Sequence, residues 1–147
     1  MSVSYKPSDY HSITPHLTIK GASELMEFFK SVFDAHERSR TLDQDGRIAN
    51  AEMLIGDSIM MLAEATEKYP PMPSQFYLYI PDIDATFQRG LQAGAVSIMA
   101  PADQFYGDRL AGFQDPSGNM WWLATHIEDV SPAEMQRRAD EWRASQA

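Results

Sequence analysis

The chain of 147 residues contains no cysteine. This absence excludes disulfide bonds, thiolate nucleophiles and cysteine-based zinc or iron–sulfur sites. Long apolar runs are missing too. No segment approaches the roughly 18 residues that a membrane-spanning helix needs, and the N-terminus has no apolar stretch that could serve as a signal peptide. We therefore expect a cytoplasmic protein that has no membrane partner.

Positive charge is scarce. There are 12 lysine and arginine residues against 21 aspartate and glutamate residues, which gives a formal net charge of −9. Such a chain is not attracted to nucleic-acid phosphates, so we expect no nucleic-acid partner. The content of 44% hydrophobic and 22% charged residues is typical of a folded globular protein. At this length we expect a single domain over 1–147 with an ordinary hydrophobic core.

Hydrophobic periodicity divides the chain into two similar halves. Apolar residues at helical spacing predict one helix over 22–33 and another that begins after Asp82. Alternating or apolar segments bounded by turns predict the strands. The predicted strands are 13–19, 36–42, 47–55 and 58–64 in the first half, and 76–80, 96–100, 109–114 and 119–125 in the second. Each half therefore has the order βαβββ.

The two halves also match residue by residue. An ungapped offset of 61 residues places Ile19 on Ile80 and Leu62 on Leu123. We interpret this as a duplicated module, although chance similarity between two amphipathic segments is the alternative. The expected parts are module one at about 12–64, a proline-containing linker at 65–74, module two at about 75–126 and a C-terminal helix at about 131–145. A capping box, Ser131-Pro-Ala-Glu134, begins this last helix.

One face of each predicted sheet has the composition of a ligand cavity. Each helix covers one face of its strands, so alternate residues belong to the opposite face. That face mixes large apolar groups with a few polar ones, as small-molecule cavities do, although a face buried against a partner chain is the alternative. The candidate ligand-binding residues are Thr14, His16, Asn50, Glu52, Gln75, Tyr77, Tyr79, Arg109, Phe113 and Trp122.

Tandem βαβββ modules of this length resemble the vicinal oxygen chelate superfamily, which includes glyoxalases, bleomycin-resistance proteins and extradiol dioxygenases. The segments that carry the resemblance, which covers roughly residues 12–126, are 14–19, 45–53, 56–63, 106–109 and 115–123. The sequence is most similar to the glyoxalase-like branch associated with phosphonate operons. The resemblance implies an α+β fold in which the two modules form a curved mixed sheet around a cavity, and the C-terminal helix predicted above follows this fold. It also implies a homodimer, because members commonly pair modules across two chains.

In metal-dependent members of that superfamily, His, Glu or Gln side chains on the cavity strands hold one divalent ion. The positions that match here are Thr14, Glu52, Gln75 and Trp122, of which only Glu52 is a good ligand for a hard ion. A shifted site with His16 and Glu52 has two protein ligands, whereas catalytic metals usually keep three. We therefore predict no metal and no other cofactor. A divalent-metal lyase, isomerase or dioxygenase is the alternative.

Glu52 and His16 are also a candidate catalytic acid–base pair. A glutamate in a partly apolar pocket has its charged form disfavoured and can accept a proton near neutral pH. An ordinary ion pair between Glu52 and Arg109 explains the same residues equally well. The aromatic groups on this face, such as Trp122, favour a protein that binds a small, partly aromatic organic molecule, with or without weak catalysis. A ligand-free dimeric interaction module is the remaining alternative.

Overall fold

The computed structural model describes residues 2–147, in which eight strands and three helices form. The elements in chain order are β1 (His16–Ile19), α1 (Ala22–Phe33), β2 (His36–Leu42), β3 (Ile48–Ile55), β4 (Ser58–Glu64), β5 (Gln75–Tyr79), α2 (Ile83–Gln92), β6 (Val96–Asp103), β7 (Asp108–Gln114), β8 (Met120–His126) and α3 (Pro132–Ser145). The predicted α+β fold with two βαβββ units and a C-terminal helix is confirmed. Among the described residues, no helix combines the length and the apolar character needed to cross a membrane.

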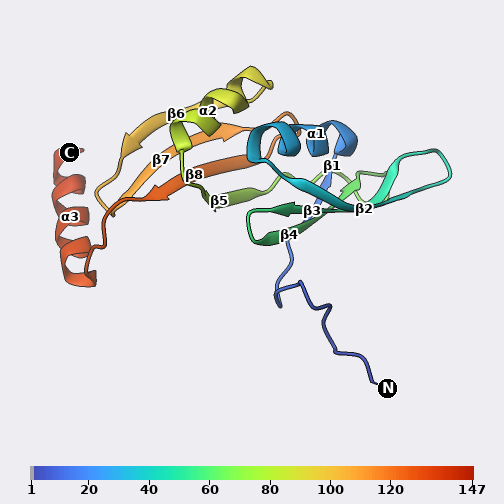
Figure 1. The fold of residues 1–147 in the computed structure, drawn as a ribbon. Helices are drawn as coiled ribbons and strands as arrows, with labels where there is room; N and C mark the ends of the chain where they lie inside the picture. Colours follow the sequence, from blue (N-terminus) through green and yellow to red (C-terminus); the bar gives the residue numbers. More distant parts are fainter. Residues whose placement is uncertain (1) are drawn as a thin grey trace.

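Each βαβββ unit forms its own four-stranded mixed sheet. The strand orders are β1-β4-β3-β2 and β5-β8-β7-β6, with the first pair of each sheet parallel and the others antiparallel. Figure 1 shows α1 and α2 on the same side of the two sheets, while the N-terminal segment extends from the opposite side. The sheet faces away from the helices are called the open faces below.

A shared aromatic cluster joins the two units beneath the helices. The ring of Phe33 in α1 lies 4.7 Å from that of Trp121 in β8, and the ring of Phe28 lies 5.8 Å from that of Phe113 in β7. Arg89 of α2 also donates a hydrogen bond of 3.1 Å to the carbonyl oxygen of Val32. One continuous core therefore fixes how the two sheets sit relative to each other.

The 61-residue offset holds for the parallel strand pairs, which are β1 with β4 and β5 with β8. Leu17 pairs with Leu62 in the first sheet, and Leu78 pairs with Leu123 in the second. The offset is wrong by one residue for β7. Leu62 pairs with Ala51, but Leu123 pairs with Ala111, which lies 60 residues after Ala51.

The extra residue lies in the turn between β7 and β8. In the first unit Ile55 pairs with Ser58 across a two-residue turn, whereas in the second the Asp115 amide donates to the Asn119 carbonyl across three residues. The Asp115 carboxylate accepts hydrogen bonds from the backbone amides of Ser117 and Asn119, which holds this longer turn. Because side chains alternate along a strand, this one inserted residue exchanges the two faces that the 61-residue offset assigns to β7.

The C-terminal helix α3 lies at the end of the second sheet that is farthest from the first (Figure 1), and none of its side chains is buried. Ser131 caps it by accepting a hydrogen bond of 3.2 Å from the Glu134 amide. Arg138 attaches it to the body of the protein by donating to the Phe105 carbonyl at 3.0 Å and to Glu128 at 2.7 Å. The helix is thus held mainly by polar contacts.

Candidate functional site

Each open face carries its own hollow. The hollow on the first sheet has a volume of about 470 Å³ and is lined in part by His16, Thr18 and Tyr69. The hollow on the second sheet has a volume of about 500 Å³ and is lined by Gln75, Phe76, Tyr77, Tyr106, Leu110 and Trp122. The candidate residues of the two halves therefore belong to two separate hollows.

On the first sheet, the structure does not bring the candidate acid–base pair together. Met61 of β4 pairs with His16 on one side and with Glu52 on the other, so His16 and Glu52 stand two strands apart. This separation corresponds to about 10 Å between their Cα atoms. No hydrogen bond joins these two side chains in the part of the chain that the structure describes.

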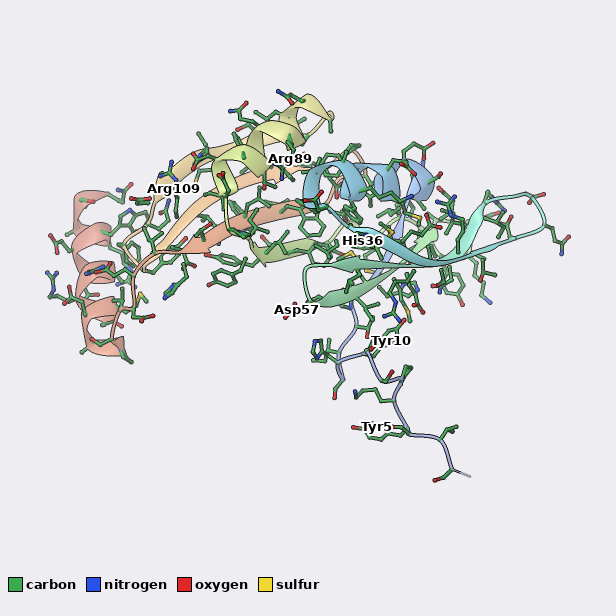
Figure 2. All side chains as sticks on the ribbon, viewed as in Figure 1. Tyr5, Tyr10, His36, Asp57, Arg89 and Arg109 are labelled. Carbon is green, nitrogen blue, oxygen red and sulfur yellow. The ribbon has the colours of Figure 1, made fainter. Side chains whose placement is uncertain are left out.

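Glu52 instead faces Tyr10 of the N-terminal segment, which Figure 2 shows below the first sheet. Burial, together with the neighbouring Glu52 carboxylate, raises the pKa of Tyr10 to about 12. The Tyr10 hydroxyl is nevertheless buried without a hydrogen-bond partner among residues 2–147. The segment is also held by Arg38, which forms an ion pair of 3.2 Å with Asp9. The N-terminal segment thus occupies the space in front of Glu52.

The other polar candidates of the first half are dispersed. Asn50 lies on β3 with Glu52 and is half-buried. Thr14 precedes β1 and lines a separate hollow of about 260 Å³ together with the N-terminal segment. The first sheet therefore does not gather its predicted residues into one constellation.

Two candidates of the second half lie on the opposite face from the one expected. Phe113 is fully buried beneath α2, where a Cβ atom added to Gly90 would lie 2.1 Å from its ring. Arg109 points to the side of α2, as Figure 2 shows, and forms ion pairs with Asp84 at 2.9 Å and Asp103 at 3.0 Å. Their predicted place on the open face is wrong, because the additional turn residue reverses the faces that the 61-residue offset assigns to β7. The alternative ion pair of Arg109 with Glu52 does not form, because Arg109 lies on the helix side of the second sheet and Glu52 on the open face of the first.

Trp122 is the central aromatic group of the second open face. Its indole lies over Gly112 of the neighbouring strand so closely that a Cβ atom added there would be 2.6 Å from the ring. The indole Nε1 donates a hydrogen bond of 2.8 Å to the Oε1 atom of Gln75. Gln75 and Trp122, both predicted for the cavity, are therefore brought together, and the hydrogen bond orients the indole.

A hydrogen-bond network around Asp108 lies beside this hollow. The Asp108 Oδ2 atom accepts from the hydroxyls of Tyr77 at 2.6 Å and Tyr79 at 2.9 Å. Its Oδ1 atom lies 2.9 Å from Nδ1 of His126, whose Nε2 atom lies 2.7 Å from Asp129. The protonated imidazole, which has two donors, satisfies both carboxylates at once.

The network shifts the titration of its members. Burial alone would raise the pKa of Asp108, but the hydrogen bonds from two phenols and an imidazole outweigh it and lower this pKa. Hydrogen bonds to Asp108 and Asp129 raise the pKa of His126 above 6.5. Burial and the bond to Asp108 raise the pKa of Tyr77, and the bond to Asp108 raises that of Tyr79. The network therefore favours the carboxylate form of Asp108, the imidazolium form of His126 and the neutral form of both phenols.

Sequence reasoning missed three residues of this site, namely Tyr106, Asp108 and His126. Asp108 and His126 each lie one residue outside the predicted strands 109–114 and 119–125. The sequence contains a signal for these residues, because the segment from Asp115 to Asn119 is one residue longer than the corresponding turn segment of the first half. Taking this residue into account would have placed Asp108, Leu110 and Gly112 on the open face.

The site does not offer a set of donors that fits a divalent metal. The positions expected from metal-dependent relatives fall on two sheets, and the oxygen of Gln75 already accepts the Trp122 indole proton. Both nitrogens of His126 face carboxylates. Over residues 2–147, no group of three or more His, Asp or Glu side chains is arranged to hold a metal ion.

Comparison with known sequences gives a family match over most of the chain. Residues 11–123 match the model of the Glyoxalase/Bleomycin resistance protein/Dioxygenase superfamily. The uncharacterized protein Mb0911c of Mycobacterium bovis is 31% identical over 150 residues, which cover 92% of this chain and 94% of the relative.

Comparison with solved structures supports the same fold. TioX from Micromonospora sp. ML1 has a TM-score of 0.68 at 22% identity and covers 80% of this chain and 99% of its own. TnmS3, an antibiotic binding protein from Streptomyces sp. CB03234, has a TM-score of 0.63 at 20% identity, and the match covers 86% of this chain and 98% of TnmS3. The fosfomycin resistance protein FosX from Mesorhizobium loti has a TM-score of 0.59 at 18% identity, and the match covers 80% of this chain and 92% of FosX.

Proposed function

Because the chain belongs to the glyoxalase/bleomycin resistance protein/dioxygenase superfamily, we propose that it binds a small, partly aromatic organic molecule without the help of a metal. The binding site is the hollow on the open face of the second sheet. The bound molecule stacks on Trp122, and the neighbouring polar groups orient it.

The observation that carries this proposal is the arrangement of the Trp122 indole. Gly112 leaves room for the ring to lie against the sheet, and Gln75 holds its nitrogen. A ring fixed in this way presents a preformed stacking surface, so little conformational entropy is lost when a ligand binds. Tyr77 and Tyr106 extend the aromatic surface around the same hollow.

The relatives support a binding role. TnmS3 is described as an antibiotic binding protein, and FosX as a fosfomycin resistance protein. Both share the fold with this chain, so the fold itself is suited to small organic ligands. A metal-dependent reaction has no such support, because Trp122 stands where a fourth ligand is expected. The relation to the phosphonate-operon branch stays a prediction.

The test is ligand binding by the Trp122→Ala variant. A thermal-shift screen of planar aromatic metabolites and antibiotics first identifies a ligand, and calorimetric titration then gives its affinity. We expect Trp122→Ala to weaken binding by about 1–3 kcal/mol, because the stacking area is lost. Trp142→Ala, on the exposed face of α3, is the matched control and should bind as the wild type does.

Two outcomes contradict the proposal. In one, Trp122→Ala keeps the affinity of the wild type but melts at a much lower temperature, which makes Trp122 a core residue and not a ligand contact. In the other, Glu52→Gln abolishes turnover of a substrate while Trp122→Ala does not affect its binding, which places the chemistry on the first sheet.

A further inference from the structure

The hydroxyl protons of Tyr77 and Tyr79 are both committed to Asp108. The two groups donate to the same carboxylate oxygen, Oδ2, at 2.6 and 2.9 Å. A phenol has a single proton to donate, so each of these oxygens has only acceptor lone pairs left for another partner. The two residues are 46% and 59% exposed, respectively, so a ligand can reach their side chains. Asp108 thus makes two accessible tyrosines act as hydrogen-bond acceptors.

Asp108 remains charged in this arrangement. Its side chain is only 6% exposed, and its second oxygen accepts from His126 at 2.9 Å. The other nitrogen of the imidazole faces Asp129 at 2.7 Å. Two carboxylates therefore surround one imidazole, and the cluster keeps a net negative charge even when His126 is protonated.

No basic side chain is among the residues that line the hollow. Arg109, which is on the bordering strand, lies on the helix side and is neutralised by Asp84 and Asp103. The remaining lining is largely aromatic, and the faces of Tyr and Trp rings attract cations. The acceptor oxygens, the nearby net negative charge and the ring faces all favour a positively charged ligand.

We propose that the ligand of this hollow is an organic cation whose ammonium or amidinium N–H groups donate to the oxygen of Tyr77, which lines the hollow, and to that of Tyr79 beside it. Its aromatic part stacks on Trp122, and in this respect the inference rests on the proposed function. An anion on the same ring system meets acceptor atoms and a net negative cluster, so it is disfavoured.

Three naphthalene derivatives with one ring system and different charge test this selectivity. They are 1-naphthylmethylamine, which is a cation at neutral pH, 1-naphthylmethanol and 1-naphthoate. In calorimetric titrations we expect the amine to bind about tenfold or more tightly than 1-naphthoate, because its charged donors pair with the tyrosine oxygens. The alcohol, a neutral donor, should lie between them.

Two variants test whether the tyrosine oxygens and Asp108 produce this order. The double variant Tyr77→Phe/Tyr79→Phe keeps both rings and removes both oxygens, so the preference for the amine over 1-naphthoate should fall severalfold. Asp108→Asn removes the negative charge of the cluster, so binding of 1-naphthoate should improve. Tyr5→Phe, on the exposed N-terminal segment, is the matched control and should keep the wild-type order. In the tyrosine variants the Asp108 carboxylate keeps its contact of 2.9 Å with His126, so they answer the question even if Asp108→Asn unfolds.

The outcomes separate this inference from the proposed function. Equal or tighter binding of 1-naphthoate, with Trp122→Ala weakening all three probes, overturns the cation selectivity but leaves aromatic binding intact. An unchanged preference for the amine in the tyrosine double variant also overturns it. If none of the probes binds the wild type at millimolar concentration, the proposed function itself is contradicted, and the inference with it.

Discussion

His126 links the binding face to the segment before α3, because its two nitrogens face Asp108 on β7 and Asp129 beyond β8. Only the protonated imidazole of His126 can donate a hydrogen bond to both aspartates. The aspartates therefore stabilise the imidazolium in the folded protein and raise the pKa of His126 above 6.5. This single side chain makes part of the stability depend on pH.

The sign of this dependence follows from proton linkage. A histidine whose pKa is higher in the folded state stabilises the protein fully below its unfolded pKa of about 6.5, and this stabilisation is lost as the pH rises through the folded value. We expect the free energy of unfolding of the wild type to decrease as the pH rises above about 6.5 more than that of His126→Gln does. Urea denaturation at several pH values measures this. Parallel pH profiles for the two proteins would show that the contacts to Asp108 and Asp129 do not hold the imidazolium.

At the scale of elements, the turn from Asp115 to Asn119 determines which residues of β7 reach the open face. The buried Asp115 carboxylate accepts the Trp121 indole proton at 2.8 Å and the Asn119 side-chain amide at 2.9 Å, in addition to the two backbone amides. Removing the Asp115 carboxylate leaves several buried hydrogen-bond donors without partners. Each such donor is costly because it has lost water without gaining another acceptor.

We expect Asp115→Ala to lower the free energy of unfolding by about 3 kcal/mol. Asp43→Ala is the matched control in the turn between β2 and β3, where Asp43 accepts from the exposed amides of Asp45 and Arg47. Water can replace those hydrogen bonds, so the free energy of unfolding of the control should fall by less than about 1 kcal/mol. Equal losses in the two variants, measured by urea denaturation, would mean that the Asp115 turn has no special structural role.

The turn also explains how far the sequence could predict the structure. Helical and strand periodicity predicted the order of the elements and most of their bounds, because burial imposes a period on each element. The face that Phe113 and Arg109 occupy depends on the number of residues in one turn. An alignment of the two halves without a gap does not account for the extra turn residue and assigns the wrong face. The contact of His126 with Asp108 could not be predicted either, because it depends on the pairing of β7 with β8 over 18 residues of separation.

For the whole molecule, the two sheets leave edges of different character. The β2 edge carries charged side chains such as Glu37, Arg38 and Arg40, which oppose pairing with another strand. The β6 edge instead exposes Val96 and Ile98, at 64% and 42%. Charged edges are protected from association and apolar edges are not. We therefore propose a homodimer in which a second copy covers the β6 edge.

Static light scattering tests the assembly. We expect the wild type to have the mass of a dimer at micromolar concentration, and Ile98→Lys to shift it toward the monomer, because a charge on the edge opposes association. Arg38→Lys on the β2 edge keeps the charge and should leave the mass unchanged. A wild-type monomer would contradict the dimer, and a dimer unaffected by Ile98→Lys would exclude this edge as the interface.

The binding role of Trp122 can be tested most directly in an NMR titration, because the chain has three tryptophans in three different environments. Trp121 is buried and bonded to Asp115, Trp122 lies in the hollow, and Trp142 is on α3. During titration of ¹⁵N-labelled protein with 1-naphthylmethylamine, we expect a saturable shift of the Trp122 indole N–H signal, identified by its loss in Trp122→Phe. The Trp142 signal should not move, and that of Trp121 should move less. Saturable binding that leaves the Trp122 signal in place would contradict a ligand site on the second open face.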